Sequence, residues 1–285
     1  MMPKQFWRDN EDKIKFISVY KDGTGINLLE RKDVITNEEV YSEKIEDVAD
    51  RVTELINKTQ RLGSRQRSTL NAAIQKTLEG NDDAVLGDVH KLLEDMGAKD
   101  VKDKISLLSR RNVFGKASLD WKEILYEEPK ITVFQLSGFP DNIKTLISEV
   151  ILTDFLQYAM HTGNTDNPCV LWMDECQMAN LSKASTMDNI LRLGRKLGIN
   201  AILCTQYMKN GFKNDAENFL STAYTTLIFK PSDSEVKMLA HRYGINDHRE
   251  LMGLEAGQCC AIGKFVDENN RLLKGEYQIV KFDSL

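Results

Sequence analysis

The sequence predicts an α/β fold in which helices cover both faces of a mainly parallel sheet. Three observations predict it. Strand-like and helix-like patterns alternate along much of the chain. Two short runs, CVLWM at 169–173 and NAILCT at 200–205, are apolar on both sides, as central strands of a parallel sheet are. The composition, with 41% hydrophobic and 28% charged residues, is that of an ordinary globular protein.

The first third of the chain predicts one strand and then a helical block. KFISVY at 15–20 has strand composition and is followed by the turn residues DGTG. From residue 45 to about 62, apolar residues recur every three or four positions, which predicts a helix that ends before Gly63. The same pattern predicts three further helices, at about 64–78, 86–96 and 101–110. Residues 45–112 therefore form a helical block between strands.

The remainder of the chain alternates between strand and helix. Strands are predicted at 131–136, 169–173, 200–205 and 224–229, and helices at 143–156, 186–197 and 234–243. Two last strands, 257–263 and 276–282, flank the polar turn at 267–270 and predict a closing hairpin.

Charge and cysteine content restrict the class of protein. The net charge is −5, from 38 Lys and Arg against 43 Asp and Glu, and no basic stripe is visible. A nucleic acid would therefore have to meet a local surface or a ring of subunits. No apolar run is long enough to cross a membrane, and the N-terminus lacks the apolar core of a secretory signal. Five cysteines without a CxxC pair fit a reducing cytoplasm, and the four histidines lack metal-ligand spacing.

The most informative segment is the buried strand that ends in two adjacent carboxylates, Asp174 and Glu175. The carboxyl ends of parallel strands open into the ligand crevice of such a sheet. An Asp there can hold Mg²⁺, directly or through water, and a neighbouring Glu can polarise an attacking water. The alternative is that either acid caps the next helix or forms a surface turn.

The next predicted strand ends in a hydroxyl and an amide, Thr205 and Gln206. If the two strands are neighbours, these residues lie beside Asp174 and Glu175. A polar pair in that place can sense a γ-phosphate or orient a water molecule. The alternative is a pair of loop residues that satisfy their own backbone.

These segments resemble a known family. VLWMDECQ followed by GRKLGINAILCTQY is similar to the HerA/FtsK division of P-loop ATPases, which includes the conjugative secretion ATPases. GSRQRSTLNAAI at 63–74 resembles the helical insert of that family. ITVFQLSGF at 131–139 resembles the strand before the acidic one, and LEAGQCCAIGKF at 254–265 the terminal hairpin. The chain also resembles, more narrowly, the ATPase part of phosphorothioation-dependent DNA restriction proteins of the DptH type. No feature of composition or spacing shows this narrower resemblance.

The resemblance implies a RecA-like ATPase domain over residues 1–285, with residues 45–112 as a helical insertion within it. It implies that Asp174 is the Walker B acid associated with Mg²⁺ through water and that Glu175 is the catalytic base. Thr205 and Gln206 would contact ATP, with Gln206 as the sensor. The family assembles as rings, usually hexamers, that act on DNA. Arg192 or Arg195, which share a helix face, could then reach a neighbouring subunit's γ-phosphate; the alternative for both is ordinary surface charge.

One departure from the family matters. The 285 residues contain no G-x-x-x-x-G-K-[ST] phosphate loop, and the stretch DGTG at 22–25 lacks the lysine and its spacing. The chain could be the C-terminal, larger part of a longer protein, one half of a split ATPase, or a degenerate subunit. The abrupt start inside the fold favours the first. We expect such a chain to be inactive alone and to expose apolar sheet surface, which leads to self-association or is covered by a substitute strand.

Three functions follow from these patterns. The first is the C-terminal part of a DNA-translocating motor ATPase, in which Lys209 and Lys213, past the sensor strand, could face DNA. The second is a non-catalytic interaction subunit that assembles with a partner bearing the phosphate loop. The third is a nuclease that uses Asp174 and Glu175 as metal ligands, which would need further carboxylates at the other strand ends; the sequence supplies none at Ser137 or Lys230.

Overall fold

The structure is a computed structural model, and it describes residues 10–35, 39–127, 131–162, 165–182, 185–206, 223–263 and 277–282. Its longer helices are α3 (Ile45–Gln60), α4 (Ser64–Gly80), α5 (Leu86–Asp95), α6 (Lys99–Arg110), α8 (Asp141–Thr162), α9 (Thr186–Leu197) and α11 (Asp233–Arg242). Its short helical segments are η1 (Glu11–Lys13), α2 (Val19–Asp22), α7 (Trp121–Tyr126), η2 (Cys176–Met178) and α12 (Arg249–Met252). Its strands are β1 (Ile14–Ser18), β2 (Asp33–Ile35), β3 (Val40–Ser42), β4 (Ile131–Gln135), β5 (Cys169–Met173), β6 (Ile199–Leu203), β7 (Thr226–Ile228), β8 (Gln258–Ile262) and β9 (Tyr277–Lys281).

The first strand is shorter than its sequence predicts. β1 ends at Ser18, and Val19–Asp22 turns into the helical segment α2 instead of extending the strand. The turn buries Val19 completely and is closed by a hydrogen bond from the Gly23 N–H to the Val19 carbonyl, 3.1 Å long. Gly23 has φ 76°, and a Cβ there would lie 2.8 Å from the Asn112 carbonyl oxygen. The tight turn against the chain at residue 112 therefore requires glycine.

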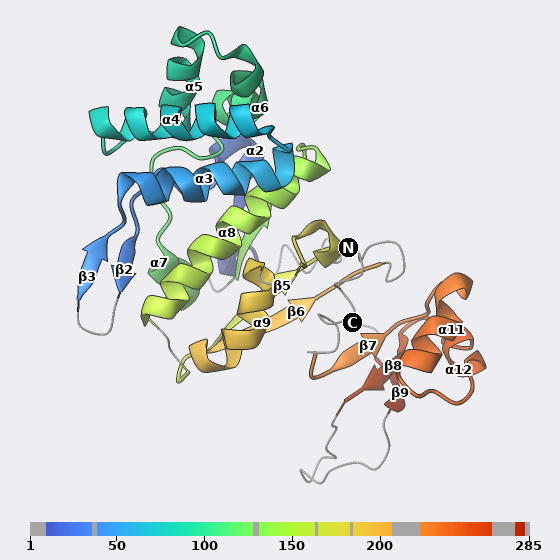
Figure 1. The fold of residues 1–285 in the computed structure, drawn as a ribbon. Helices are drawn as coiled ribbons and strands as arrows, with labels where there is room; N and C mark the ends of the chain where they lie inside the picture. Colours follow the sequence, from blue (N-terminus) through green and yellow to red (C-terminus); the bar gives the residue numbers. More distant parts are fainter. Residues whose placement is uncertain are drawn as a thin grey trace.

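The helical block contains the four helices that the periodicity predicts, α3 to α6. The antiparallel helices α3 and α4 pack side by side, and α5 and α6 lie against α4 on the side away from α3 (Figure 1). Arg61, directly after the end of α3, is in the left-handed conformation (φ 50°), and α4 begins after Gly63, whose N–H donates to the Gln66 side chain at 3.0 Å. The apolar residues at three- and four-residue spacing are the buried ones, as the pattern predicts: Val48, Val52, Ile56, Leu70, Ala73, Ile74, Leu86, Val89, Leu93, Val101, Ile105 and Leu108.

The block stands between two strands that pair directly. β1 and β4 form a parallel ladder in which Ile14 lies opposite Ile131 and Ser18 opposite Gln135. The hairpin of β2 and β3 also lies in this stretch, and the sequence patterns do not predict it because three-residue strands are too short to show alternation.

β5 and β6 form a second parallel ladder, with Met173 opposite Leu203. α8 lies between α3 and α9, and α9 leads into β6 (Figure 1). Leu171, Met173 and Leu203 pack against the main hydrophobic core with these helices. The opposite face of this sheet differs from the expectation of burial on both sides, because Trp172 remains 60% exposed.

Of the predicted mainly parallel sheet, the described residues form two parallel strand pairs, which are not joined to each other by hydrogen bonds. In all, the described residues form four separate hydrogen-bonded sheets, β1–β4, β2–β3, β5–β6 and β7–β8–β9. The last contains the predicted terminal hairpin of β8 and β9, both antiparallel to their neighbours, with β7 as its third strand. It has a hydrophobic core of its own with α11 and α12, separate from the core that β1, β4, β5 and β6 share. None of the described helices combines the length and apolar character that a membrane crossing requires.

Candidate functional site

Four of the predicted site residues lie where β5 and β6 end side by side: Asp174, Glu175, Thr205 and Gln206. Beyond the last paired residues, the Cys204 N–H donates to the Met173 carbonyl at 2.9 Å, and the Cys176 N–H donates to the Cys204 carbonyl at 2.8 Å. These bonds hold the chain on both sides of Glu175 against the chain before Thr205. The two strand ends thus form one edge, as expected for neighbouring parallel strands.

Glu175 is at the centre of this edge. Its Oε1 accepts a hydrogen bond from the side-chain amide of Gln206, and its Oε2 accepts one from the side-chain amide of Gln177. Its backbone is in the left-handed region, with φ 52° and ψ 50°, which is uncommon for a residue with a side chain. The strand end is therefore shaped to direct one carboxylate between two amides. The role of Gln177 was not predicted, although the residue stands in the DECQ segment.

Asp174 is the more exposed of the two acids. Its Oδ1 accepts a hydrogen bond from the Glu175 N–H at 3.1 Å, so the second oxygen remains available to a cation or water. Thr205, half-buried, follows Cys204 at the end of the neighbouring strand. One carboxylate with a nearby hydroxyl fits Mg²⁺, which keeps several waters and takes few protein ligands. No group of three or more His, Cys, Asp or Glu side chains with metal-site geometry occurs among the described residues, which leaves the nuclease reading without its extra ligands.

The two candidate arginines lie on the exposed side of α9, away from the buried residues Met187 and Ile190. Arg192 pairs with Asp188 one turn earlier, with 3.0 Å between Nε and Oδ1, and its side chain is 57% exposed. Arg195 is exposed and has no ion pair within the part of the chain that the structure describes. Among the described contacts, neither arginine pairs with Glu175 or Gln206, and both side chains are exposed.

A polar stripe on α8 supports the segment between Glu175 and α9. The Thr145 hydroxyl donates to the Met178 carbonyl at 2.7 Å, three residues after Glu175. One helical turn further on, Glu149 is 5% exposed and its Oε1 accepts from the Thr186 hydroxyl at 2.8 Å, at the first residue of α9. These contacts fix both ends of the segment from one helix. The spacing of four residues between Thr145 and Glu149, on a helix with many apolar residues, could have indicated these contacts from the sequence.

Burial and the two nearby acids raise the pKa values of the two thiols beside the site, Cys176 and Cys204. Burial, with the nearby Cys204 thiol and the two carboxylates, raises the pKa of Cys176 to about 11. Burial and then Asp174 raise the pKa of Cys204. Both thiols are therefore neutral at ordinary pH, and neither resembles an activated nucleophile.

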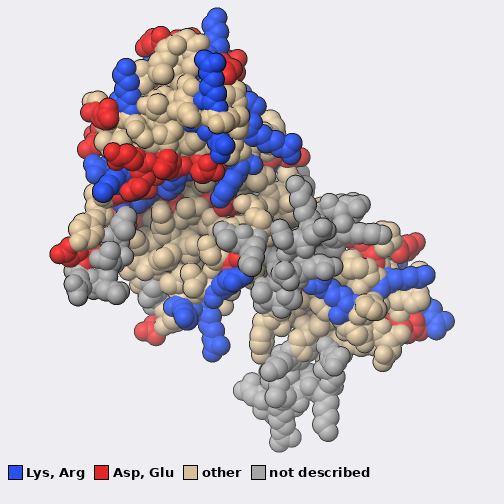
Figure 2. Space-filling model, viewed as in Figure 1, with Lys and Arg blue, Asp and Glu red and all other residues tan. Residues whose placement is uncertain are grey.

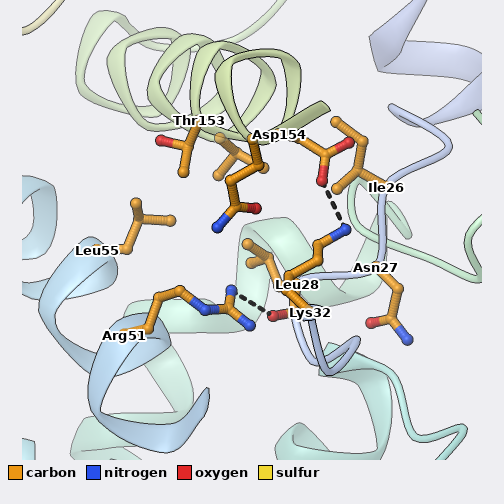
Figure 3. Close-up of a pocket in the computed structure, with 10 residues that line it drawn as sticks. Ile26, Asn27, Leu28, Lys32, Arg51, Leu55, Thr153 and Asp154 are labelled. Carbon is orange, nitrogen blue, oxygen red and sulfur yellow. Dashed lines mark hydrogen bonds and ion pairs between the residues drawn. The ribbon is translucent and has the colours of Figure 1, made fainter. Parts of the chain in front are cut away.

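A separate polar cluster occupies a shallow hollow between α3, α8 and the loop at 26–32 (Figure 3). Lys32 Nζ lies 2.7 Å from Asp154 Oδ1 and 2.7 Å from Glu30 Oε2, and the Trp121 indole donates to Asp154 Oδ2 at 2.8 Å. Arg51 donates to the Leu28 carbonyl at 3.2 Å. Every cation here already has partners, so the cluster anchors the loop to α3 and α8. None of the predicted site residues lines the hollow.

The charged surface shows no basic stripe on the face seen in Figure 2. A band of acidic side chains lies over α3, and basic side chains are scattered over the helical block above it. The exposed acids of α3 are Glu46, Asp47, Asp50 and Glu54. The predicted DNA-facing residues, Lys209 and Lys213, lie outside the described residues.

Comparison with known proteins identifies the fold. No protein-family model and no curated protein sequence matches the chain. VirB4 of Thermoanaerobacter pseudethanolicus matches 99% of the chain and 79% of its own length, with a TM-score of 0.66 at 13% sequence identity. The plasmid coupling protein TrwB, solved with the ATP analogue ADPNP, matches 95% of the chain and 74% of its own length, with a TM-score of 0.58 at 12% identity. TrwB was also solved with ADP and Mg²⁺, with the same TM-score.

At such low identity these likenesses show the fold alone. The chain has the α/β fold of RecA-like ATPases and is structurally similar to the conjugative secretion ATPases of the HerA/FtsK type. The family resemblance read from VLWMDECQ and GRKLGINAILCTQY is thus supported at the level of fold.

Proposed function

We propose that the chain carries the metal- and water-directing part of the nucleotide site of a DNA-translocating motor ATPase. The observation that supports this most is the position of Glu175, fixed between the Gln177 and Gln206 amides at the edge where β5 and β6 end. A surface turn alone would not require a glutamate in the left-handed conformation whose carboxylate accepts hydrogen bonds from two amides.

Each side chain has a distinct task in this proposal. Asp174 would hold Mg²⁺ through water with its second carboxylate oxygen, and the ion would supply charge neutralisation at the phosphates. Glu175 is oriented by its two amide donors and accepts the proton of the attacking water. A Gln amide carries two N–H donors, so Gln206 can keep one on Glu175 and direct the other to a phosphate oxygen. Thr205 supplies a hydroxyl beside the same phosphate.

Two requirements of hydrolysis are not met by the chain itself. It has no glycine-rich phosphate loop with its lysine, so we expect it to be inactive alone and to depend on a segment that supplies one, such as an N-terminal part of a longer form of the protein. The second requirement is a cation at the γ-phosphate: the exposure of Arg192 and Arg195 on α9 fits a role across a subunit boundary in a ring, with one of them reaching the nucleotide of the next subunit. DNA would then be contacted by the ring.

The proposal is tested by ATP hydrolysis with Mg²⁺, measured for the chain alone and for a form extended by the coding sequence upstream. Turnover is expected only in the extended form. Glu175→Gln should reduce kcat by at least about 100-fold, the usual scale for loss of a general base, while nucleotide binding persists. Arg192→Ala and Arg195→Ala, mixed with wild-type chains, distinguish action within a subunit from action between subunits. Absence of nucleotide binding in both forms would exclude a nucleotide site.

A second candidate is a non-catalytic subunit that assembles with a partner bearing the phosphate loop. The exposed apolar side chains of the β5–β6 sheet favour it, because such a face needs a cover. It is distinguished in the same assay: the assembled complex would hydrolyse ATP, and Glu175→Gln would leave the rate unchanged.

A further inference from the structure

One ionisable side chain is found among the buried residues of α8: Glu149, which is 5% exposed. Its Oε1 accepts a hydrogen bond from the Thr186 hydroxyl at 2.8 Å and a longer one from the Thr186 N–H at 3.4 Å. Thr186 is the first residue of α9, where the backbone N–H groups have no partner within the helix. Glu149 therefore joins the middle of α8 to the N-terminus of α9.

Stability does not account for a carboxylic side chain at this position. The Oε2 of Glu149 is buried and has no hydrogen-bond partner among the described residues. A buried polar oxygen without a donor lowers the stability of a fold. Apolar side chains of similar shape in place of both partners of a buried polar contact are often neutral or stabilising. Glu149 is therefore better explained by what it holds in place than by what it adds to stability.

The same helix also holds the turn that follows Glu175. One helical turn before Glu149, the Thr145 hydroxyl donates to the Met178 carbonyl at 2.7 Å. The Met178 N–H in turn donates to the Glu175 carbonyl at 2.9 Å. Met178 thus links α8 to the backbone of Glu175, four residues along α8 from the contact with α9.

α9 is the helix that carries both candidate arginines. Arg192 and Arg195 lie on its exposed side, while Met187 and Ile190 are buried. α9 packs against α8 (Figure 1). A displacement of the first residue of this helix would move both arginines, and a misplacement of about 1 Å is enough to slow a reaction strongly.

We infer that Glu149 is a positioning residue for the proposed reaction. Through Thr186 it sets the position of α9, and so of Arg192 and Arg195, relative to the Glu175 turn that Thr145 holds. The inference rests on the proposed function for the roles of Glu175 and the arginines. It rests on the buried contact between Glu149 and Thr186 for the position of α9.

The test replaces both partners of the contact, Glu149→Met together with Thr186→Val, so that neither side chain leaves the other with a buried polar atom unpaired. The Thr153 hydroxyl keeps its 2.7 Å hydrogen bond to the backbone carbonyl of residue 149. ATP hydrolysis with Mg²⁺ is measured in the form extended by the coding sequence upstream, and thermal unfolding in the same preparation. kcat should fall by about 10- to 100-fold, with the KM for ATP within about twofold and the unfolding temperature unchanged or higher.

α11 offers a matched control. Glu235 is also 5% exposed, and its Oε2 accepts a hydrogen bond from the Ser232 hydroxyl at 2.9 Å at the start of that helix. α11 belongs to the other hydrophobic core and carries none of the proposed site residues. Glu235→Met together with Ser232→Ala should therefore leave kcat within about twofold of the wild type.

An arginine-deficient background separates positioning from a general loss of structure. In chains with Arg192→Ala or Arg195→Ala, whichever lowers kcat more, the double change at 149 and 186 should have little further effect, because the arginine to be positioned is gone. Hydrogen exchange at the amides of residues 186–190, measured on the chain itself, needs no turnover. It should be faster in the double variant than in the wild type and unchanged in the α11 control.

Four results would overturn the inference: a wild-type kcat in the double variant, an equal loss in the α11 control, the full loss in the arginine-deficient background, or unchanged exchange at 186–190. The proposed function is read separately. If Glu175→Gln abolishes turnover but the double variant retains it, the proposed function stands and the positioning role falls. If no form hydrolyses ATP but exchange at 186–190 is faster, the proposed function falls and the role of Glu149 in placing α9 stands.

Discussion

The Gln206 side-chain amide donates a hydrogen bond to the Glu175 carboxylate across the ends of two neighbouring parallel strands. The two residues are 31 positions apart in the chain, and the ladder of β5 and β6 brings them together. Glu175 reaches this position only because its own backbone is left-handed, at φ 52°. Strain of this kind persists where the surrounding contacts determine it, and it concentrates at functional sites.

The left-handed backbone of Glu175 predicts an unusual order of stability. Both Glu175→Gly and Glu175→Ala lose the hydrogen bonds to the two amides, but only glycine occupies positive φ without a steric cost. Glu175→Gly should therefore be the more stable variant, by about 1 kcal/mol, in urea denaturation. At Asp174, which is not among the positive-φ residues, the order should reverse, with Asp174→Ala above Asp174→Gly. The same order at both positions would show that the glutamate backbone is unstrained.

Gly194 of α9 is predicted to be required by packing. A Cβ at this position would lie 2.9 Å from the Ile199 carbonyl oxygen, a backbone atom that cannot move aside. Helix propensity favours alanine by about 1 kcal/mol, but the clash should outweigh it and leave Gly194→Ala less stable by about 1–3 kcal/mol. Gly87→Ala in α5, where the nearest atom would be 3.8 Å away, is the control and should gain stability. Equal effects in thermal unfolding would refute the packing argument.

The buried thiol beside the site predicts slow alkylation and an alkaline loss of stability. At pH 8 a thiol with a pKa of about 11 has roughly a hundredth of the thiolate of a thiol with the ordinary pKa of 9.0, so iodoacetamide should modify Cys176 at least that much more slowly than in the unfolded chain. The pKa of this thiol is higher in the folded chain than in the unfolded chain. Its contribution to the unfolding free energy is therefore fully present below pH 9 and is lost as the pH rises towards 11. Cys176→Ala should flatten the decline of unfolding free energy in that window; an unchanged profile would contradict the assignment.

The position of Glu175 beside Gln206 could be predicted because the two strands are parallel neighbours. Apolar runs of five to six residues that end in polar pairs identify a crevice edge, and the hydrogen bond between Glu175 and Gln206 follows from placing the two runs side by side. The contribution of Gln177 could not be predicted, because it depends on the turn that the left-handed Glu175 produces. Gly194 was read as part of a motif, and its physical reason is the close approach of α9 to β6.

Burial on both faces was predicted wrongly for Trp172 for an informative reason. An apolar strand predicts that both of its faces are covered, but it does not say which segment covers them. Trp172 is 60% exposed because nothing among the described residues covers it. Similarly, the strand predicted at 15–20 stops at Ser18 because the complete burial of Val19 is achieved by turning the chain, a tertiary effect that strand propensity cannot report.

The ion pair of Lys32 and Asp154 is predicted to be the main electrostatic anchor of the loop at 26–32. Asp154→Ala removes one of the two carboxylate partners of the largely buried Lys32 ammonium and leaves the Trp121 indole N–H without its acceptor, so it should lower the unfolding free energy by about 3 kcal/mol. Asp154→Asn keeps an acceptor for the indole and removes only the charge, so it should cost less. A double-mutant cycle with Lys32→Met, measured by urea denaturation, isolates the pair, and an additive cycle would mean that the contact contributes nothing.

The pH dependence of the same pair gives an independent check. Burial lowers the pKa of Lys32, but the charges and hydrogen bonds of Asp154 and Glu30 outweigh it, so the pKa is raised above the ordinary 10.5. A raised folded pKa means that the stabilisation is complete below pH 10.5 and disappears as the pH rises through the folded value. Lys32→Met removes this loss. The wild-type and Lys32→Met chains should therefore differ in unfolding free energy at pH 8 and converge above pH 10.5, and a constant difference across that range would show that the Lys32 side chain stabilises the loop by packing rather than by charge.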